Sequence, residues 1–272
     1  MTQVPLVSIV MPAFNSARYI AASIDSVRRQ SLKDWELLIV DGGSRDRTVE
    51  IVARYLAEDP RIRLIPNPDD KGPAHARSTG VRHARGEYVA FLDNDDLWLR
   101  DKLSAQLDFM RRTSTDFSYT QYRILNSQGS EVSCPVSVHR QYGYPSYLFM
   151  RGIACSTVAV RRALFSQDIL ETYGLWHGED TLWWLKLLRA GAHARGVLKP
   201  LVLYRDAEGS LSKHVTRNQS SVWRIYREDF GLSRIFALVA YTSYVADVAL
   251  RRLRNRVCTK FHGSLKIGEV DV

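Results

Sequence analysis

The stretch Phe91-Leu92-Asp93-Asn94-Asp95-Asp96-Leu97-Trp98 places three acidic residues directly after the apolar run Tyr88-Val89-Ala90-Phe91-Leu92. Such a run predicts a buried strand, and in open α/β sheets ligands bind outside the carboxyl ends of the strands. Asp93 and Asp95 alternate along an extended backbone, so one can reach a hard divalent cation while the other addresses a sugar or ribose. We interpret the stretch as a metal-diphosphate site. A D-x-D triplet taken alone is more often a solvated acidic loop that caps the next helix.

Three strand-loop-helix units precede this stretch and indicate the fold class. Strands are predicted over residues 7–11, 36–40, 61–65 and 88–92, with helices after the first three. The second helix is expected to use Ser44 as its N-cap and to turn Val49 and Val52 inward, and the third opens at Gly72-Pro73. Strands alternating with helices predict a doubly wound, mostly parallel α/β sheet with right-handed crossovers, so the loops that follow the strands should share one rim.

Four segments of the chain resemble glycosyltransferase family 2, whose members have the GT-A nucleotide-diphospho-sugar fold. In chain order they are Val7-Ser8-Ile9-Val10-Met11-Pro12-Ala13-Phe14-Asn15, Glu36-Leu37-Leu38-Ile39-Val40-Asp41-Gly42-Gly43-Ser44-Arg45-Asp46, Lys71-Gly72-Pro73-Ala74-His75-Ala76-Arg77 and Phe91-Leu92-Asp93-Asn94-Asp95-Asp96. All four stand in the family's order and spacing, which makes the set far more specific than any one segment.

The resemblance implies a binding site for a nucleotide-diphospho-sugar, with UDP as the expected nucleotide and Mn²⁺ or Mg²⁺ as the expected cofactor. Nucleotide-binding roles are implied for Pro12, Ala13, Asn15, Asp41, Lys71, Arg77, Asp93 and Asn94, and metal-binding roles for Asp95 and His214. The family's residue at Asp41 hydrogen-bonds the uracil ring. Gly42 stands where the family usually has a second acid, and Asp70 where it usually has Asn, which affects base recognition rather than the fold.

The catalytic candidate lies in the second half, where Glu179 and Asp180 begin an amphipathic stretch that ends before Gly191. Acids are electrostatically favoured in the first turn of a helix, so capping alone would explain them. In family 2, however, a Glu-Asp pair before a Trp-containing helix carries the general base, and Asp180 is the matching position. A carboxylate within about 3 Å of the attacking sugar hydroxyl can take its proton. Inversion of configuration is expected, with Glu179 orienting Asp180 or contacting the acceptor.

A third segment, Tyr204 to His214, resembles the family's tyrosine-arginine loop. Arg205, Lys213 and His214 are expected to close over the diphosphate, where negative charge builds as the glycosidic bond breaks. His214 is the second candidate metal ligand by analogy with some GT-A enzymes, although a single histidine is more often an ordinary surface residue.

Composition suits one large α/β domain with an appended region: the chain has 272 residues, of which 45% are hydrophobic. We expect residues 1–100 to form the nucleotide-diphospho-sugar-binding half, 101–215 the acceptor-binding and catalytic half, and 216–272 a helical extension. Cys134, Cys155 and Cys258 are odd in number and widely spaced, which predicts reduced thiols. The amino terminus lacks the pattern of a signal peptide, so a cytoplasmic location is expected.

The formal charge of +9 calls for an anionic partner. Nucleic acid is not expected, because no nucleic-acid-binding motif accompanies the basic residues. The uncharged run from Ile235 to Ala246 is shorter than the ~20 residues that span a bilayer, but with the arginines after it the run suits an interfacial helix. The expected location is then peripheral, on the inner face of the cytoplasmic membrane. The alternative is a helix packed on the catalytic domain, with Trp223 among its partners.

The function that these observations favour is an inverting glycosyltransferase that adds a sugar to a lipid-linked saccharide or a growing surface polysaccharide. The alternatives are a nucleotidyltransferase, a processive polysaccharide synthase and a non-catalytic nucleotide-sugar-binding protein. Pro12-Ala13-Phe14-Asn15 is not a glycine-rich phosphate loop, and the Gln-x-x-Arg-Trp signature of processive synthases is missing. Intact Asp93, Asp95 and Asp180 argue against a protein that only binds.

Overall fold

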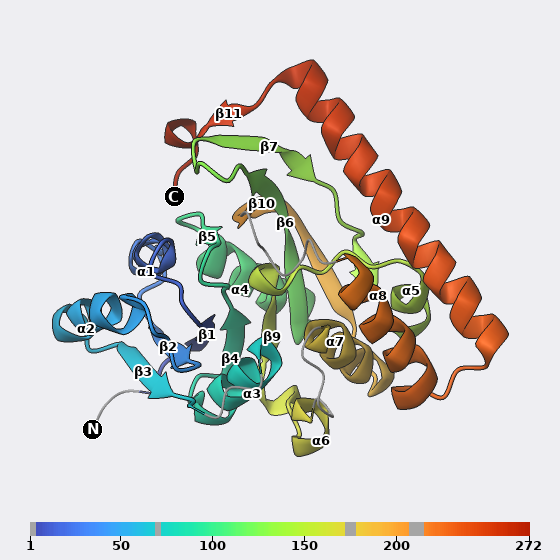
Figure 1. Cartoon of the computed structure of the whole chain (residues 1–272), viewed down its shortest axis with the longest axis horizontal. Helices are drawn as coiled ribbons and strands as arrows, with labels where there is room; N and C mark the ends of the chain where they lie inside the picture. The colour runs from blue at the N-terminus through green and yellow to red at the C-terminus, as the bar shows by residue number, and fades with distance from the viewer. Residues whose placement is uncertain (1–3, 69–71, 172–177, 207–214) are drawn as a thin grey trace.

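One eleven-stranded mixed sheet organises the part of the chain that the computed structural model describes, namely residues 4–68, 72–171, 178–206 and 215–272 (Figure 1). The main path through the sheet runs β11-β7-β6-β9-β4-β1-β2-β3, and β10 joins it through β6. The first elements are β1 (Val7–Ala13), α1 (Ile20–Arg28), β2 (Trp35–Asp41), α2 (Thr48–Glu58), β3 (Ile62–Pro66), α3 (Pro73–His83), β4 (Tyr88–Phe91), β5 (Leu97–Trp98) and α4 (Lys102–Thr113). The later ones are β6 (Phe117–Leu125), β7 (Glu131–Val136), β8 (Gln141–Tyr142), α5 (Tyr144–Phe149), β9 (Ala159–Arg161), α6 (Gln167–Leu170), α7 (Glu179–Arg189), β10 (Ala194–Arg205), α8 (Val215–Arg224), α9 (Arg234–His262) and β11 (Leu265–Lys266).

The first four strands form the parallel part of the sheet, as the sequence predicts. β1 pairs in parallel with β2 on one side and with β4 on the other, and β3 extends the sheet beyond β2. Every residue of β1, β2 and β4 is buried, which explains their near-continuous apolar sequence, because both faces of a parallel sheet are covered.

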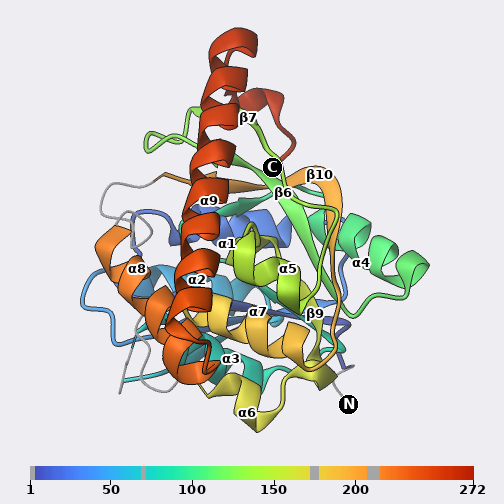
Figure 2. The same ribbon diagram turned by 90° about the vertical axis from the view of Figure 1, so that its right-hand side faces the viewer.

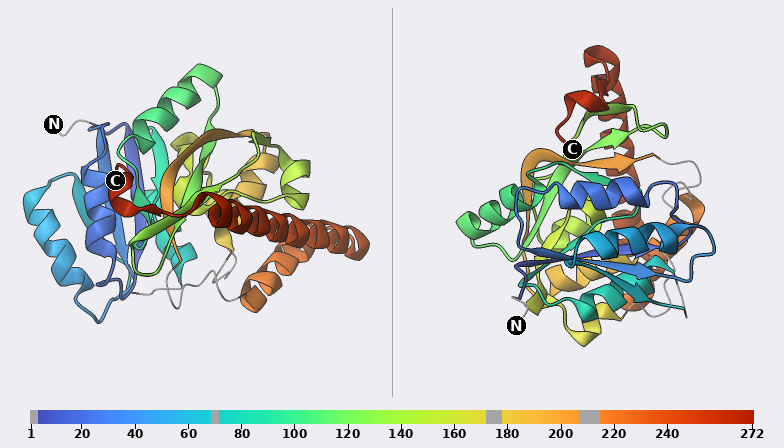
Figure 3. Two further views of the ribbon diagram at one scale, coloured as in Figure 1. Left: turned by 90° about the horizontal axis from the view of Figure 1, so that it is seen from above. Right: turned by 90° about the vertical axis from the view of Figure 1, so that its left-hand side faces the viewer.

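Helices cover both faces of this parallel part, which confirms the doubly wound α/β class (Figure 3). Ile9, Met11 and Leu37 share one core cluster with residues of α1, α2 and α4. Val10 and Leu38, whose side chains point the other way, share a second cluster with residues of α3 and α7. The alternation follows from the two-residue period of a strand.

The second half of the sheet contains mostly antiparallel pairs. β9 pairs antiparallel with both β4 and β6, and β10 runs parallel to β6 but antiparallel to β5 and β8. The strands after the acidic stretch therefore continue the same sheet and do not start a second one.

The C-terminal region packs along the side of the domain and then returns to the sheet. α9 lies beside α5 and β7 in both views, and its ring contacts include Phe149 with Phe236 at 5.5 Å between centroids (Figures 1 and 2). β11 pairs antiparallel with β7, and the amide of Arg100 donates to the carbonyl of Asp271 over 3.1 Å. Among the described residues, no helix is both long and apolar enough to cross a membrane.

Two local predictions are wrong. The second helix begins at Thr48 and has Arg47 at its N-cap. Ser44 does not cap this helix, because its hydroxyl donates to the carboxylate of Asp41. Val49 is 39% exposed in the first turn of this helix, whereas Val52 is buried as predicted.

The cysteine prediction is also wrong for two of the three residues. Cys134 and Cys258 form a disulfide, and Cys155 is the free, buried cysteine. The bridge joins β7 to α9 across 124 residues of sequence, so only the packing of α9 brings the two sulfurs together. Asn255 donates to the carbonyl of Cys134 over 2.7 Å in the same contact.

Candidate active site

The carboxyl ends of β1, β2 and β4 meet at one edge of the sheet, as parallel pairing requires; we call this edge the rim. Ala13 stands beside Asp41 in the register of β1 and β2. The side-chain amide of Asn94 donates to the carbonyl of Pro12 over 2.9 Å, which ties the acidic stretch to the end of β1. The structure thus brings the predicted residues Pro12, Ala13, Asp41 and Asn94 together.

Two loops on the rim, residues 14–17 and 43–48, are held together by hydrogen bonds. The carboxylate of Asp41 accepts from the amides of Gly43 and Ser44 over 3.1 Å each and from the Ser44 hydroxyl over 2.5 Å. Asn15, with φ +48°, accepts from the Arg45 amide over 2.8 Å. Both predicted nucleotide ligands therefore shape the rim, and their contact with a base remains a prediction.

The acidic stretch divides into two rim acids and one structural acid. Asp93 and Asp95 remain partly exposed, whereas Asp96 is buried. Asp96 accepts from the Ser156 hydroxyl over 2.5 Å and from the Arg205 amide over 2.8 Å. Burial, reinforced by the neighbouring carboxylates, raises its pKa well above the ordinary value. Asp96 thus fixes the acidic stretch to Ser156 and to the end of β10.

Ser156 and Arg205 are two supports of this stretch whose contacts the sequence did not reveal. The Ser156 hydroxyl also accepts from the Asp93 amide over 3.1 Å. Arg205 is 6% exposed, donates from Nε to the carbonyl of Asp95 over 2.8 Å, and lies over the ring of Tyr19 at 4.6 Å. These contacts place Arg205 within the support of the stretch, and its predicted closure over a diphosphate is untested.

Arg77 connects the acidic stretch to the candidate catalytic helix. It lies on α3, is 8% exposed, and forms ion pairs with Asp93 and with Glu179. The two carboxylates raise its pKa well above the ordinary value against the effect of burial, so the side chain is a permanent buried cation. A single guanidinium thus joins residues that are 16 and 102 positions away in the chain.

The start of α7 places Glu179 and Asp180 in the same region. Gly178 precedes them with φ +83°, a backbone conformation that favours glycine. Trp183 and Trp184 are fully buried, and each lies 5.9 Å from the ring of Phe91. Because Phe91 ends β4 two residues before Asp93, these contacts fix α7 against the strand that leads into the acidic stretch.

Burial controls the ionisation of both helix acids. It raises the pKa of Glu179, which is 3% exposed, to about 7, although the Arg77 cation beside it opposes the shift. Burial likewise raises the pKa of Asp180, again opposed by Arg77. Asp180 accepts only from the amide of Thr181 over 2.6 Å among the hydrogen bonds found in the described residues, so a carboxylate oxygen is left for a substrate.

The rim acids fit a divalent cation that also binds a diphosphate. Burial and the nearby Asp93 raise the pKa of Asp95 to about 6, although the Arg205 and Arg77 cations oppose the shift. Within the described ranges no group of three His, Cys, Asp or Glu forms a ready-made metal site. A pair of rim carboxylates such as Asp93 and Asp95 suits Mg²⁺ or Mn²⁺, which commonly take one or two carboxylates together with phosphate oxygens. The predicted ligands Lys71 and His214, and also Lys213, lie outside the described residues.

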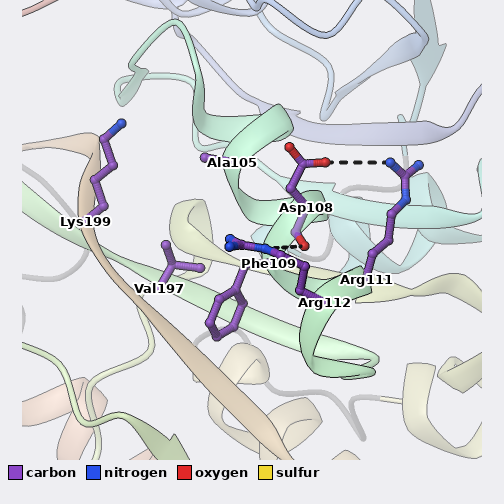
Figure 4. A pocket seen from close by; sticks show the side chains of 7 residues that line it. All are labelled: Ala105, Asp108, Phe109, Arg111, Arg112, Val197 and Lys199. Atoms are coloured by element: carbon purple, nitrogen blue, oxygen red, sulfur yellow. Dashed lines mark hydrogen bonds and ion pairs between the residues drawn. The ribbon is translucent and has the colours of Figure 1, made fainter.

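A separate groove of about 670 Å³ lies between α4 and β10 (Figure 4). Phe109, Arg112 and Lys199 are among its lining residues. None of the candidate site residues lines it, so this groove is distinct from the site at the rim.

Comparison with known proteins places the chain among glycosyltransferases. The model of the family described as "Glycosyl transferase family 2" matches residues 8–174. The glycosyltransferase TuaG of Bacillus subtilis, assigned to teichuronic acid biosynthesis, is 33% identical over 249 residues, which cover 92% of this chain and 98% of TuaG. The Escherichia coli enzyme WfgD, named a UDP-Glc:alpha-D-GlcNAc-diphosphoundecaprenol beta-1,3-glucosyltransferase, is 33% identical over 241 residues, covering 87% of this chain and 92% of WfgD.

Solved structures show the same fold at low sequence identity. Staphylococcus aureus TarS 1-349 in complex with UDP-GlcNAc superposes with a TM-score of 0.64 at 20% identity, covering 80% of this chain and 65% of that one. The mannosyltransferase PcManGT of Pyrobaculum calidifontis, in complex with GDP-Man and Mn²⁺, gives a TM-score of 0.61 at 20% identity, covering 93% and 76%.

Proposed function

This chain belongs to glycosyl transferase family 2, and we propose that it inverts the anomeric centre while it moves a sugar from a UDP-linked donor to a saccharide acceptor. The acceptor is a lipid-linked saccharide or a growing surface polysaccharide. One observation carries the proposal: Arg77 joins Asp93 of the acidic stretch to Glu179 of the catalytic helix, so both halves of a transfer site lie together.

The donor assignment rests on the rim and on the relatives. The loops around Asn15 and Asp41 stand at the carboxyl ends of β1 and β2, where open α/β sheets bind nucleotides. WfgD is named as a UDP-glucose enzyme, and TarS binds UDP-GlcNAc and UDP. UDP is therefore the nucleotide that we propose for this chain.

Asp93 and Asp95 would hold the divalent metal together with the diphosphate of the donor. When bound, such a cation stabilises the negative charge that develops on the leaving diphosphate. Arg77 positions Asp93, because its buried guanidinium forms an ion pair with that carboxylate.

Asp180 is the proposed general base. The acceptor hydroxyl attacks the anomeric carbon from the face opposite the diphosphate, its proton passes to Asp180, and the bond between the anomeric carbon and the diphosphate oxygen breaks. One displacement of this kind inverts the configuration. The carboxylate of Asp180 accepts from the Thr181 amide in the first turn of its own helix. The neighbouring ion pair of Arg77 and Glu179 is buried and holds this helix in place.

The test replaces Asp180 with Asn, which keeps the shape of the side chain and removes its basicity. Transfer from a UDP-sugar should fall by roughly 10²-fold or more, the usual contribution of a general base, while UDP affinity stays unchanged. Asp108→Asn, an exposed acid on α4, is the matched control and should transfer normally. Near-normal transfer by Asp180→Asn would exclude Asp180 as the base.

We also propose that α9 attaches the enzyme to an anionic membrane surface. Its packed side includes Ala237 and Ala240, so the helix does pack on the domain, as one alternative predicted. Its outer side nevertheless exposes both apolar and basic side chains, the combination of an interfacial helix. The exposed apolar residues include Ile235, Leu238, Val239, Leu250, Leu253 and Phe261, and the exposed cations include Arg252, Arg254, Arg256 and Lys260.

A further inference from the structure

Arg151 is a buried cation that forms no ion pair within the described residues. It is 5% exposed, and its Nε and Nη2 atoms are buried and make no hydrogen bond. A guanidinium has five N–H donors and cannot lose its charge, so leaving donors unsatisfied in the interior is costly. Such an arrangement is expected where a ligand completes the site.

Two aromatic rings hold this guanidinium in place. Its carbon lies 4.9 Å from the ring centre of Tyr226 and 4.6 Å from that of Tyr244. Aromatic faces attract a cation but do not accept its N–H groups in good geometry. The Tyr226 hydroxyl donates to the carbonyl of Leu148, which fixes the ring that faces Arg151.

The charged groups on the neighbouring turn of α9 are already paired. Arg251 forms an ion pair with Asp247 over 2.9 Å, and His139 approaches the same carboxylate at 3.6 Å. Arg251 lies against Gly152, where an added Cβ would come within 2.6 Å of its Nη1. Asp247 therefore neutralises Arg251 and forms no ion pair with Arg151.

Arg151 is connected to the transfer site through a short segment. Five residues later, Ser156 binds the Asp93 amide and the Asp96 carboxylate. An extended chain covers at most about 3.6 Å per residue, so the Cα atoms of Arg151 and Ser156 are within about 18 Å. The Arg151 cation is one of the charges that oppose the burial-driven rise in the pKa of Asp180. The guanidinium therefore lies within electrostatic reach of the proposed base.

The helix that carries Tyr244 also has an exposed apolar side. Tyr244 belongs to α9, and the first turns of the same helix expose Ile235, Leu238 and Val239. Figure 2 shows α5 and α9 above α7, the helix that carries Asp180, and α8 beside it. An apolar helix side, a buried cation and the proposed base in one group of helices suit an amphipathic acceptor: a lipid chain, an anionic linkage and a sugar.

We propose that Arg151, with Tyr226 and Tyr244, binds the diphosphate of a polyprenyl-diphosphate-linked acceptor, whose apolar chain lies along the exposed side of α9. This inference rests on the proposed glycosyl transfer and adds the site for the acceptor. Tyr244 is only partly buried, so the ring that covers the guanidinium borders solvent.

The experiment measures binding of farnesyl diphosphate by calorimetry to the full-length protein saturated with UDP and excess Mg²⁺. The unmodified protein should bind, Arg151→Met should bind at least tenfold more weakly, and Arg151→Lys should be intermediate, because lysine keeps the charge but lacks the planar fork. Arg112→Met removes an exposed cation on α4 and should bind normally. Farnesol and inorganic pyrophosphate replace the ligand in two further titrations, and both should bind more weakly than farnesyl diphosphate.

The outcomes separate this inference from the proposed function. UDP binding is measured first in every variant, and a chain that does not bind UDP refutes the proposed donor whatever Arg151 does. The acceptor site is overturned if Arg151→Met binds UDP normally and also binds farnesyl diphosphate as tightly as the unmodified protein does. Pyrophosphate that binds as tightly as farnesyl diphosphate overturns the lipid-linked acceptor. If Arg151→Met does not fold, Arg151→Lys decides, and unmodified affinity in that variant overturns the inference.

Discussion

Replacing Glu179 with Gln tests the electrostatic account of the site. The carboxylate is 3% exposed, and burial raises its pKa from the ordinary 4.5 to about 7. An acid with a raised pKa keeps its proton in the folded chain after the unfolded chain has lost it. Its contribution to stability is therefore full below pH 4.5 and disappears as the pH rises through 7.

The magnitude follows from the size of the shift. Each pKa unit corresponds to about 1.4 kcal/mol, so Glu179 alone should lower the free energy of unfolding by roughly 2 to 3 kcal/mol between pH 5 and pH 8. Gln does not titrate and lacks this loss. Relative to the unmodified protein, Glu179→Gln should thus gain roughly 2 to 3 kcal/mol over the same pH interval. The ion pair with Arg77 forms only when Glu179 is ionised, so its effect is already contained in the pKa of about 7 and adds no separate offset.

The assay is urea unfolding of both proteins at pH 5, 6, 7 and 8, with the difference in unfolding free energy plotted against pH. Taking the difference cancels the titration of most other groups. Glu50→Gln is the control, because Glu50 is an exposed carboxylate whose pKa is lowered by Arg47, and it should not produce the rise. A difference for Glu179→Gln that is constant from pH 5 to pH 8 would refute the argument that burial controls this acid.

Three further predictions concern the metal, the base and the membrane. Asp95→Ala should abolish the metal-dependent part of UDP binding measured by calorimetry and leave the thermal midpoint nearly unchanged, because a rim acid is not a core residue; metal-independent binding in the unmodified protein would contradict this role. Because burial raises the pKa of Asp180, the transfer rate should decline on acidification at a higher pH than an ordinary aspartate would give, and a rate that is flat down to pH 4 would count against the base. Leu238→Glu should reduce sedimentation with anionic liposomes, whereas Leu198→Glu, at a comparably exposed position on β10, should not, and equal sedimentation of the two variants would exclude α9 as the attachment site.

The parallel half of the fold was predictable because its signals are local. Apolar runs of strand length alternate with helical spacing, and only a doubly wound sheet buries both faces of such strands. Parallel pairing then brings the ends of β1, β2 and β4 to one rim, so Ala13, Asp41 and Asn94 could be grouped before any coordinates were known. The start of α7 at Glu179 was predictable for the same reason, since acids favour the first turn of a helix.

The tertiary structure alone decided which distant side chains meet. Arg77 pairs with a carboxylate 102 residues away, and Cys134 with a sulfur 124 residues away. Neither pairing leaves a trace in local periodicity, because each depends on how α3, α7 and α9 pack. The same holds for Arg151, because nothing in the local sequence distinguishes it from a surface arginine. Only the packing of α9 places the ring of Tyr244 over its guanidinium. The sequence by itself thus determined the sheet and the residues at its rim, and packing between distant elements determined which charges are buried, paired or left open.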